Sequence, residues 1–78
     1  MNRRNRIWKW RTSNGFAFQA MTYWGDFGLK LIVKRYSLDD FDQAAPPGTH
    51  QSIYDSAIVP GTEEDVLKRL GWTPENEI

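Results

Sequence analysis

The fold is decided by the stretch IWKWRTSNGFAFQAMTYWGDFGLKLIVKRYSL, residues 7–38. Runs rich in aromatic and β-branched residues, separated by glycine-containing turns, are typical of strands joined as hairpins. We therefore predict three antiparallel strands, which are Ile7–Thr12, Phe16–Trp24 and Leu29–Leu38. The reversals between them are Ser13-Asn14-Gly15 and Gly25-Asp26-Phe27-Gly28.

The first reversal decides which side chains share a face of the sheet. Side chains alternate between faces along a strand, so a slip of one residue exchanges every contact. A two-residue Asn14-Gly15 loop would separate the phenylalanines of the second strand from the tryptophans of the first. A three-residue loop, with Gly15 in the left-handed conformation, brings them together, and we prefer it for that reason. The aromatic face then carries Trp8, Trp10, Phe16, Phe18, Ala20 and Trp24.

The second reversal has two or four loop residues, and both lengths give the same alternation. Leu29, Leu31 and Val33 therefore join the aromatic face, which we expect to be the core. The opposite face, called the outer face below, is basic with apolar and tyrosine side chains between the charges. Its residues are Ile7, Lys9, Arg11, Ala17, Gln19, Met21, Tyr23, Lys30, Ile32, Lys34 and Tyr36.

Length and composition indicate one small domain, residues 6–78, preceded by a flexible basic tail, residues 1–5. A chain of 78 residues has a thin stability margin, which its four Trp, three Tyr and four Phe partly offset. The absence of cysteine excludes disulfides and thiolate metal sites. We see no signal peptide and no run of ~20 apolar residues, so we expect a cytoplasmic protein without a membrane role.

The formal net charge of zero conceals two halves of opposite sign. Residues 1–38 contain eight basic side chains and one acidic side chain, a net charge of +7. Residues 39–78 contain two basic and nine acidic side chains, a net charge of −7. The basic surface is therefore exposed to an acidic partner, or it is covered by the acidic half or by a second copy of the chain.

Two segments after the sheet are short or ambiguous. Ser37 is a candidate N-cap for a helix of one or two turns, which Pro46-Pro47-Gly48 must end. Gln51–Val59 alternates only weakly between apolar and polar residues. It is either a fourth strand at the sheet edge or an ordered loop over the core.

The last element is a helix with clear start and stop signals. Thr62 is the predicted N-cap, acidic residues fill the first turn, and Gly71 ends the helix. Its apolar stripe cannot sustain so short a helix without packing, so we place the stripe on the aromatic face. The stripe consists of Val66, Leu67 and Leu70, with Trp72 behind it.

No pattern indicates catalysis, a cofactor or a metal. His50 is the only histidine, and a nucleophile–base–orienter arrangement around it is not evident. Asp39, Asp40 and Asp42 suit the first turn of a helix, and they lack the spacing of a calcium loop. We therefore expect a protein that is not an enzyme and that needs no cofactor.

The interleaved basic and aromatic residues from Arg6 to Arg11 resemble the composition of surfaces that bind single-stranded nucleic acid. In the chosen register, however, Trp8 and Trp10 point into the core. The stacking candidates are then Tyr23 and Tyr36 on the outer face.

The sequence thus predicts an α+β fold, a three- or four-stranded antiparallel sheet with a short C-terminal helix on one face. We expect a small binding module, a regulator or inhibitor encoded by a phage or mobile element, that engages a larger protein with an acidic or mixed surface. The alternative is nucleic-acid binding by the same face, and a homodimer is left open. The predicted binding residues are Lys9, Arg11, Met21, Tyr23, Lys30, Ile32, Lys34 and Tyr36.

Overall fold

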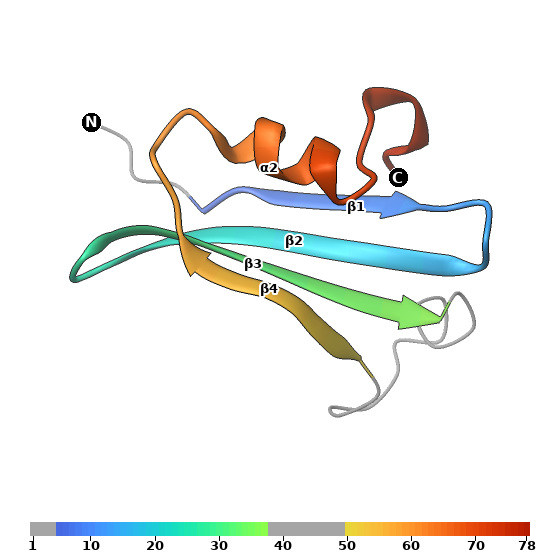
Figure 1. Cartoon of the computed structure of the whole chain (residues 1–78), viewed down its shortest axis with the longest axis horizontal. Helices are drawn as coiled ribbons and strands as arrows, with labels where there is room; N and C mark the ends of the chain where they lie inside the picture. Colours follow the sequence, from blue (N-terminus) through green and yellow to red (C-terminus); the bar gives the residue numbers. More distant parts are fainter. Residues whose placement is uncertain (1–4, 38–49) are drawn as a thin grey trace.

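The structure, a computed structural model, describes residues 5–37 and 50–78. Four antiparallel strands lie in chain order in one sheet, and a short helix and a 3-10 turn follow them (Figure 1). The strands are β1 Ile7–Arg11, β2 Phe16–Gly25, β3 Gly28–Ser37 and β4 Gln51–Ala57; the helix is α2 Glu63–Arg69 and the turn is η1 Pro74–Asn76. The predicted α+β class is confirmed. Residues 1–4 of the predicted tail, the body of the helix predicted after Ser37, and the aspartates at 39, 40 and 42 lie outside the described residues.

The register of the first hairpin is the predicted one. Trp10 lies opposite Phe18, and Trp8 lies opposite Ala20. The Thr12 amide donates to the Phe16 carbonyl at 2.9 Å, which closes the three-residue loop. Gly15 has φ +91°, a left-handed backbone conformation that residues other than glycine rarely adopt. The turn chemistry therefore sets the pairing that gathers the aromatic residues.

The second hairpin closes with a two-residue loop, Asp26-Phe27, between Gly25 and Gly28. Of the two lengths that the sequence allowed, the shorter one forms. Trp24 lies opposite Leu29, as both lengths required.

Gln51–Ala57 is a strand, which answers the question that the sequence left open. β4 pairs with β3, and the register shifts by one residue between Val33 and Lys34. Ile53 is the extra residue of this bulge, and it packs against the core together with the consecutive residue Tyr54. The bulge breaks the period of two, so the sequence of β4 shows only weak alternation.

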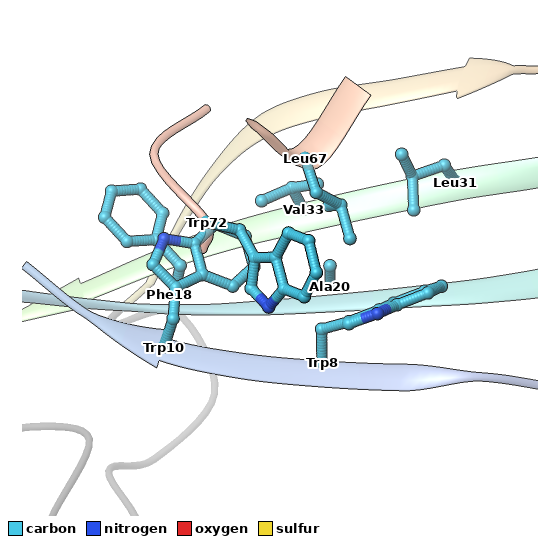
Figure 2. Packing of buried hydrophobic residues seen from close by; sticks show 8 residues of the cluster. All are labelled: Trp8, Trp10, Phe18, Ala20, Leu31, Val33, Leu67 and Trp72. Carbon is cyan, nitrogen blue, oxygen red and sulfur yellow. The ribbon is translucent and has the colours of Figure 1, made fainter. Parts of the chain in front are cut away.

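The core lies on the aromatic face, as predicted. Trp10 is fully buried, and its ring stacks on Phe18 with 5.1 Å between centroids and 6° between planes. Phe16 and Trp24 are half-buried at the margin of this face. Figure 2 shows Leu67 and Trp72 packed together with side chains of the strands. The cluster is Trp8, Trp10, Phe18, Ala20, Leu31, Val33, Leu67 and Trp72. Burial of this large apolar area is the main stabilising term of the fold.

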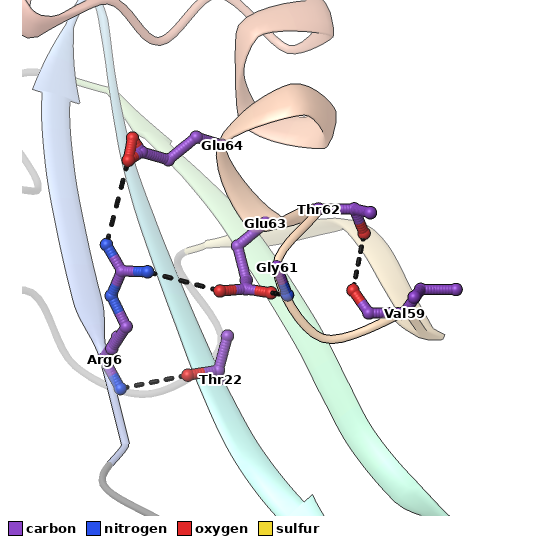
Figure 3. Close-up of polar contacts among 7 residues, drawn as sticks. All are labelled: Arg6, Thr22, Val59, Gly61, Thr62, Glu63 and Glu64. Carbon is purple, nitrogen blue, oxygen red and sulfur yellow. Dashed lines mark hydrogen bonds and ion pairs between the residues drawn. The ribbon is translucent and has the colours of Figure 1, made fainter.

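The start of α2 differs from the prediction in its chemistry. Thr62 occupies the N-cap position, but its hydroxyl donates to the Val59 carbonyl at 2.6 Å and does not cap the helix. The Glu63 carboxylate accepts from the Gly61 amide at 2.6 Å instead (Figure 3).

The end of α2 follows the prediction. Gly71 has φ +100° and its amide donates to the Lys68 carbonyl, while the Trp72 amide donates to the Leu67 carbonyl. These two bonds form the Schellman pattern that ends many helices. Leu67 and Trp72 are both buried, so the turn that ends the helix also places the Trp72 side chain in the core.

The C-terminal segment covers the free edge of β1. Thr73 and Asn76 form a reciprocal capping box around η1. The chain then extends beside β1, where Glu77 bridges to Trp10 and the Ile78 amide donates to the Lys9 carbonyl at 2.7 Å. This hook occupies part of an edge that would otherwise present unpaired backbone groups.

Candidate functional site

The structure brings all eight predicted binding residues onto the outer face. Most side chains of this face are exposed or half-buried, whereas Ala17, between Arg11 and Tyr36 in the register, is fully buried. Helix α2 and the residues directly after it contribute two buried side chains, Leu67 and Trp72, to the opposite, aromatic face. Among the described elements, the outer face is formed by the strands.

The register orders the outer face into rows of side chains that cross the strands. Residues directly opposite each other in antiparallel strands have Cβ atoms about 4.5–5.5 Å apart, so each row is a set of neighbours. From the Gly15 turn toward the Phe27 turn, the rows are Arg11–Ala17–Tyr36, Lys9–Gln19–Lys34–Ser52, Ile7–Met21–Ile32–Asp55 and Tyr23–Lys30–Ala57.

The first two rows are the basic end of the face. Lys9, Arg11 and Lys34 lie there, and neither row contains an acidic residue. Lys9 and Lys34 form no ion pair with any residue in the described ranges, 5–37 and 50–78. Both ammonium groups are therefore available to an acidic surface.

The third row is apolar for most of its length. Ile7 is 55% exposed, and Met21 and Ile32 beside it are half-buried. Three neighbouring apolar side chains in contact with water form the kind of patch that protein interfaces use as their centre.

Lys30 differs from the other cations because it already has partners. Its Nζ lies 3.1 Å from the Asp55 carboxylate and 5.8 Å from the centre of the Tyr23 ring. The hydrogen bond with Asp55, and after it the one with Tyr23, raises the pKa of Lys30 above its ordinary value. Lys30 therefore stays charged at neutral pH, but Asp55 offsets that charge locally.

The second tyrosine of the face also has an aromatic neighbour. The rings of Tyr36 and His50 lie 5.5 Å apart at 42°. His50, the only histidine of the chain, is thus a packing neighbour of the outer face. Both stacking candidates, Tyr23 and Tyr36, already have contacts within the chain.

The acidic start of α2 pairs with Arg6 and not with the cations of the outer face. The Arg6 guanidinium lies 3.2 Å from Glu63 and 3.9 Å from Glu64 (Figure 3). It also lies over the Trp8 ring, 4.4 Å from the ring centre. Within the described strands, Asp55 is the acidic side chain on the outer face. Helix α2 therefore does not cover the basic rows.

Sequence reasoning missed the tip of the β2–β3 hairpin. Phe27 is fully exposed, with an exposed fraction of 101%. Beside it is a hollow of about 260 Å³, lined by Gly25, Asp26, Phe27, Gly28, Lys30 and Ala57. The sequence did contain a signal for this feature, which is a large apolar residue, Phe27, in a turn flanked by two glycines.

The described part of the chain contains no group of three His, Cys, Asp or Glu side chains that could hold a metal ion. No helix in the same part is long and apolar enough to cross a membrane. Comparison with protein-family models, with curated proteins and with solved structures gave no match. A functional proposal therefore depends on the surface itself.

Proposed function

We propose that this chain is a non-enzymatic binding module, a regulator or inhibitor, that engages a larger protein through its outer face. One observation carries the proposal, which is the order of the rows. Two basic rows without an acidic residue lie beside an apolar row formed by Ile7, Met21 and Ile32. The other face of the same sheet is covered by α2 and by Trp72, which follows it.

This order matches what a protein interface needs. Exposed apolar side chains supply the affinity when they are buried, at roughly 25 cal/mol per Å² of apolar surface. Charged side chains at the rim mainly set the rate of association and the choice of partner. The chemistry of the partner follows: an apolar patch that meets Ile7, Met21 and Ile32, with acidic side chains opposite Lys9 and Lys34.

Nucleic-acid binding by the same face is the alternative, and the basic rows support it. Two features favour a protein. The Tyr23 and Tyr36 rings, which would have to stack on bases, are in contact with Lys30 and His50. Asp55 also places a carboxylate on the face that would have to hold phosphates.

The test is a double charge reversal, Lys9→Glu with Lys34→Glu. The matched control is Lys68→Glu with Arg69→Glu, which makes the same change of charge on the exposed end of α2. Lys30 is left unchanged, because a glutamate there would face Asp55 and disturb the fold itself. A partner is first captured from the native host, identified and purified, and its affinity for each variant is then measured.

We expect the outer-face reversal to weaken binding about 30-fold, or ~2 kcal/mol, while the control stays within about twofold. Equal affinities for the wild type and the outer-face variant, with the fold intact, would refute the proposal. A steep log-linear loss of oligonucleotide binding with salt would support the nucleic-acid alternative instead.

A further inference from the structure

We infer that Phe27, at the tip of the β2–β3 hairpin, is an anchor that inserts into an apolar cleft of the partner protein. The inference rests on the proposed function and extends the binding surface to a part of the molecule that the sequence did not single out.

The hairpin tip extends beyond both neighbouring strands. β2 and β3 have ten residues each, whereas β1 has five and β4 has seven. The pairing of β1 ends opposite Met21, and that of β4 ends opposite Lys30. At about 3.3 Å per residue, the turn lies roughly 10 Å past the last pair of β4 and roughly 15 Å past the last pair of β1. Figure 1 shows this turn as a projecting end of the sheet.

The fold does not explain a phenylalanine at this position. Two-residue hairpin loops favour Asn-Gly, Asp-Gly or Gly-Gly, because these residues adopt the required conformations. Here Gly28, with φ +112°, supplies the unusual backbone conformation. The Phe27 ring is fully exposed and contributes no burial to the core.

The tip is continuous with the outer face. The hollow beside Phe27 is lined by Lys30 and Ala57, which belong to the last row of that face. One surface thus runs from the basic rows, across the apolar row, to the projecting ring.

The two ends of this surface carry charges of opposite sign. Asp26 lies at the tip beside Phe27, while Lys9, Arg11 and Lys34 lie at the far end. Position 34 is seven positions after position 27, a distance of roughly 20 Å along a strand. The complementary partner has a cation at the mouth of its apolar cleft and acidic side chains about 20 Å away.

A second copy of the chain is a poorer occupant. Reciprocal insertion of two phenylalanines would bury about 150–250 Å² for each ring. Specific, stable interfaces bury about 1,200–2,000 Å² in total. A concave partner that receives the tip and the outer face together is not limited in this way.

The test uses a photoreactive benzophenone amino acid, p-benzoyl-phenylalanine, at position 27 of the full chain in its native host. The control carries the same group at Val59, which is 68% exposed and lies on the connection between β4 and α2. We expect position 27 to form one predominant adduct with a larger protein, at apolar residues beside a basic one, and position 59 not to form it. Crosslinking between copies, the same adducts from both positions, or no adduct from position 27 would each overturn the inference.

The purified adduct partner then allows a quantitative test. Phe27→Asn should weaken binding at least about tenfold while the melting temperature stays the same or rises, because asparagine suits a tight turn. Phe27→Leu should retain most of the affinity. Loss of binding in the Lys9→Glu, Lys34→Glu variant but not in Phe27→Asn would refute the inference alone. Loss in Phe27→Asn but not in the charge reversal would refute the outer face as the proposed site and keep the tip.

Discussion

The aromatic face and the outer face are built from the same strands, with consecutive residues on opposite sides. On the aromatic side, Trp10 and Val33 are fully buried under residues of α2 and the C-terminal segment. On the outer side, their chain neighbours Lys9 and Lys34 have no ion pair with any residue of the described ranges. Because side chains alternate between the two faces along a strand, residues that stabilise the fold and residues that can bind a partner are neighbours in the sequence. Mutations at adjacent positions should therefore differ in their effects on stability and on binding.

The largest effect is expected from Trp10→Ala. It removes a fully buried ring and its stacking on Phe18, which should lower the free energy of unfolding by about 3–5 kcal/mol. Because small domains have a free energy of unfolding of only about 5–15 kcal/mol, a substantial fraction of the molecules should be unfolded. Urea titration followed by circular dichroism measures the change.

A matched control for that variant is Trp10→Phe. It keeps a ring in the core and removes an indole N–H that has no hydrogen-bond partner among the described residues. It should therefore cost clearly less than Trp10→Ala. Equal losses in the two variants would mean that burial of this ring is not what stabilises the fold.

An intermediate effect is expected from Gly71→Ala. A Cβ at this position would meet only the Trp10 side chain, at an ordinary 3.9 Å, so the change introduces no clash. The cost comes from φ +100°, which an L side chain rarely adopts, and should be about 1–2 kcal/mol. A melting temperature equal to that of the wild type would show that the turn after α2 differs from the one described.

The smallest effect is expected from Lys9→Ala on the outer face. Its side chain is exposed, so the free energy of unfolding should change by no more than about 0.5 kcal/mol. Differential scanning calorimetry is sensitive enough to check this. A larger loss than in Trp10→Ala would reverse the assignment of the two faces.

The sequence was sufficient where local chemistry decides the structure. Gly15 indicated the length of the first hairpin loop, and with it which side chains share a face of the sheet. Gly71 indicated where the last helix ends. Both positions have a left-handed conformation, which glycine adopts readily. The eight predicted binding residues share one face because of the registers of the first and second hairpins together. These features depend on turns and on the alternation of side chains.

Other features depend on contacts between distant segments and could not be predicted. The bulge in β4, the hydrogen bond from Ile78 to Lys9 and the pairing of Lys30 with Asp55 each join residues at least 18 positions apart. The exposure of Phe27 was also hidden, because it follows from β1 and β4 ending before the hairpin does. Local patterns do not encode where a neighbouring strand stops.

The most direct test compares Val33→Cys with Lys34→Cys, adjacent positions on opposite faces of β3. The chain has no cysteine of its own, so each variant carries a single thiol, and its rate of reaction with a disulfide reagent reports its exposure. We predict that position 34 reacts at least about 100-fold faster than position 33 in the folded protein, because a core position reacts only when the structure opens. The bound partner should then slow the reaction at position 34. Similar rates at the two positions, or a reaction at position 34 that the partner does not slow, would contradict the division between a face that builds the fold and a face that binds.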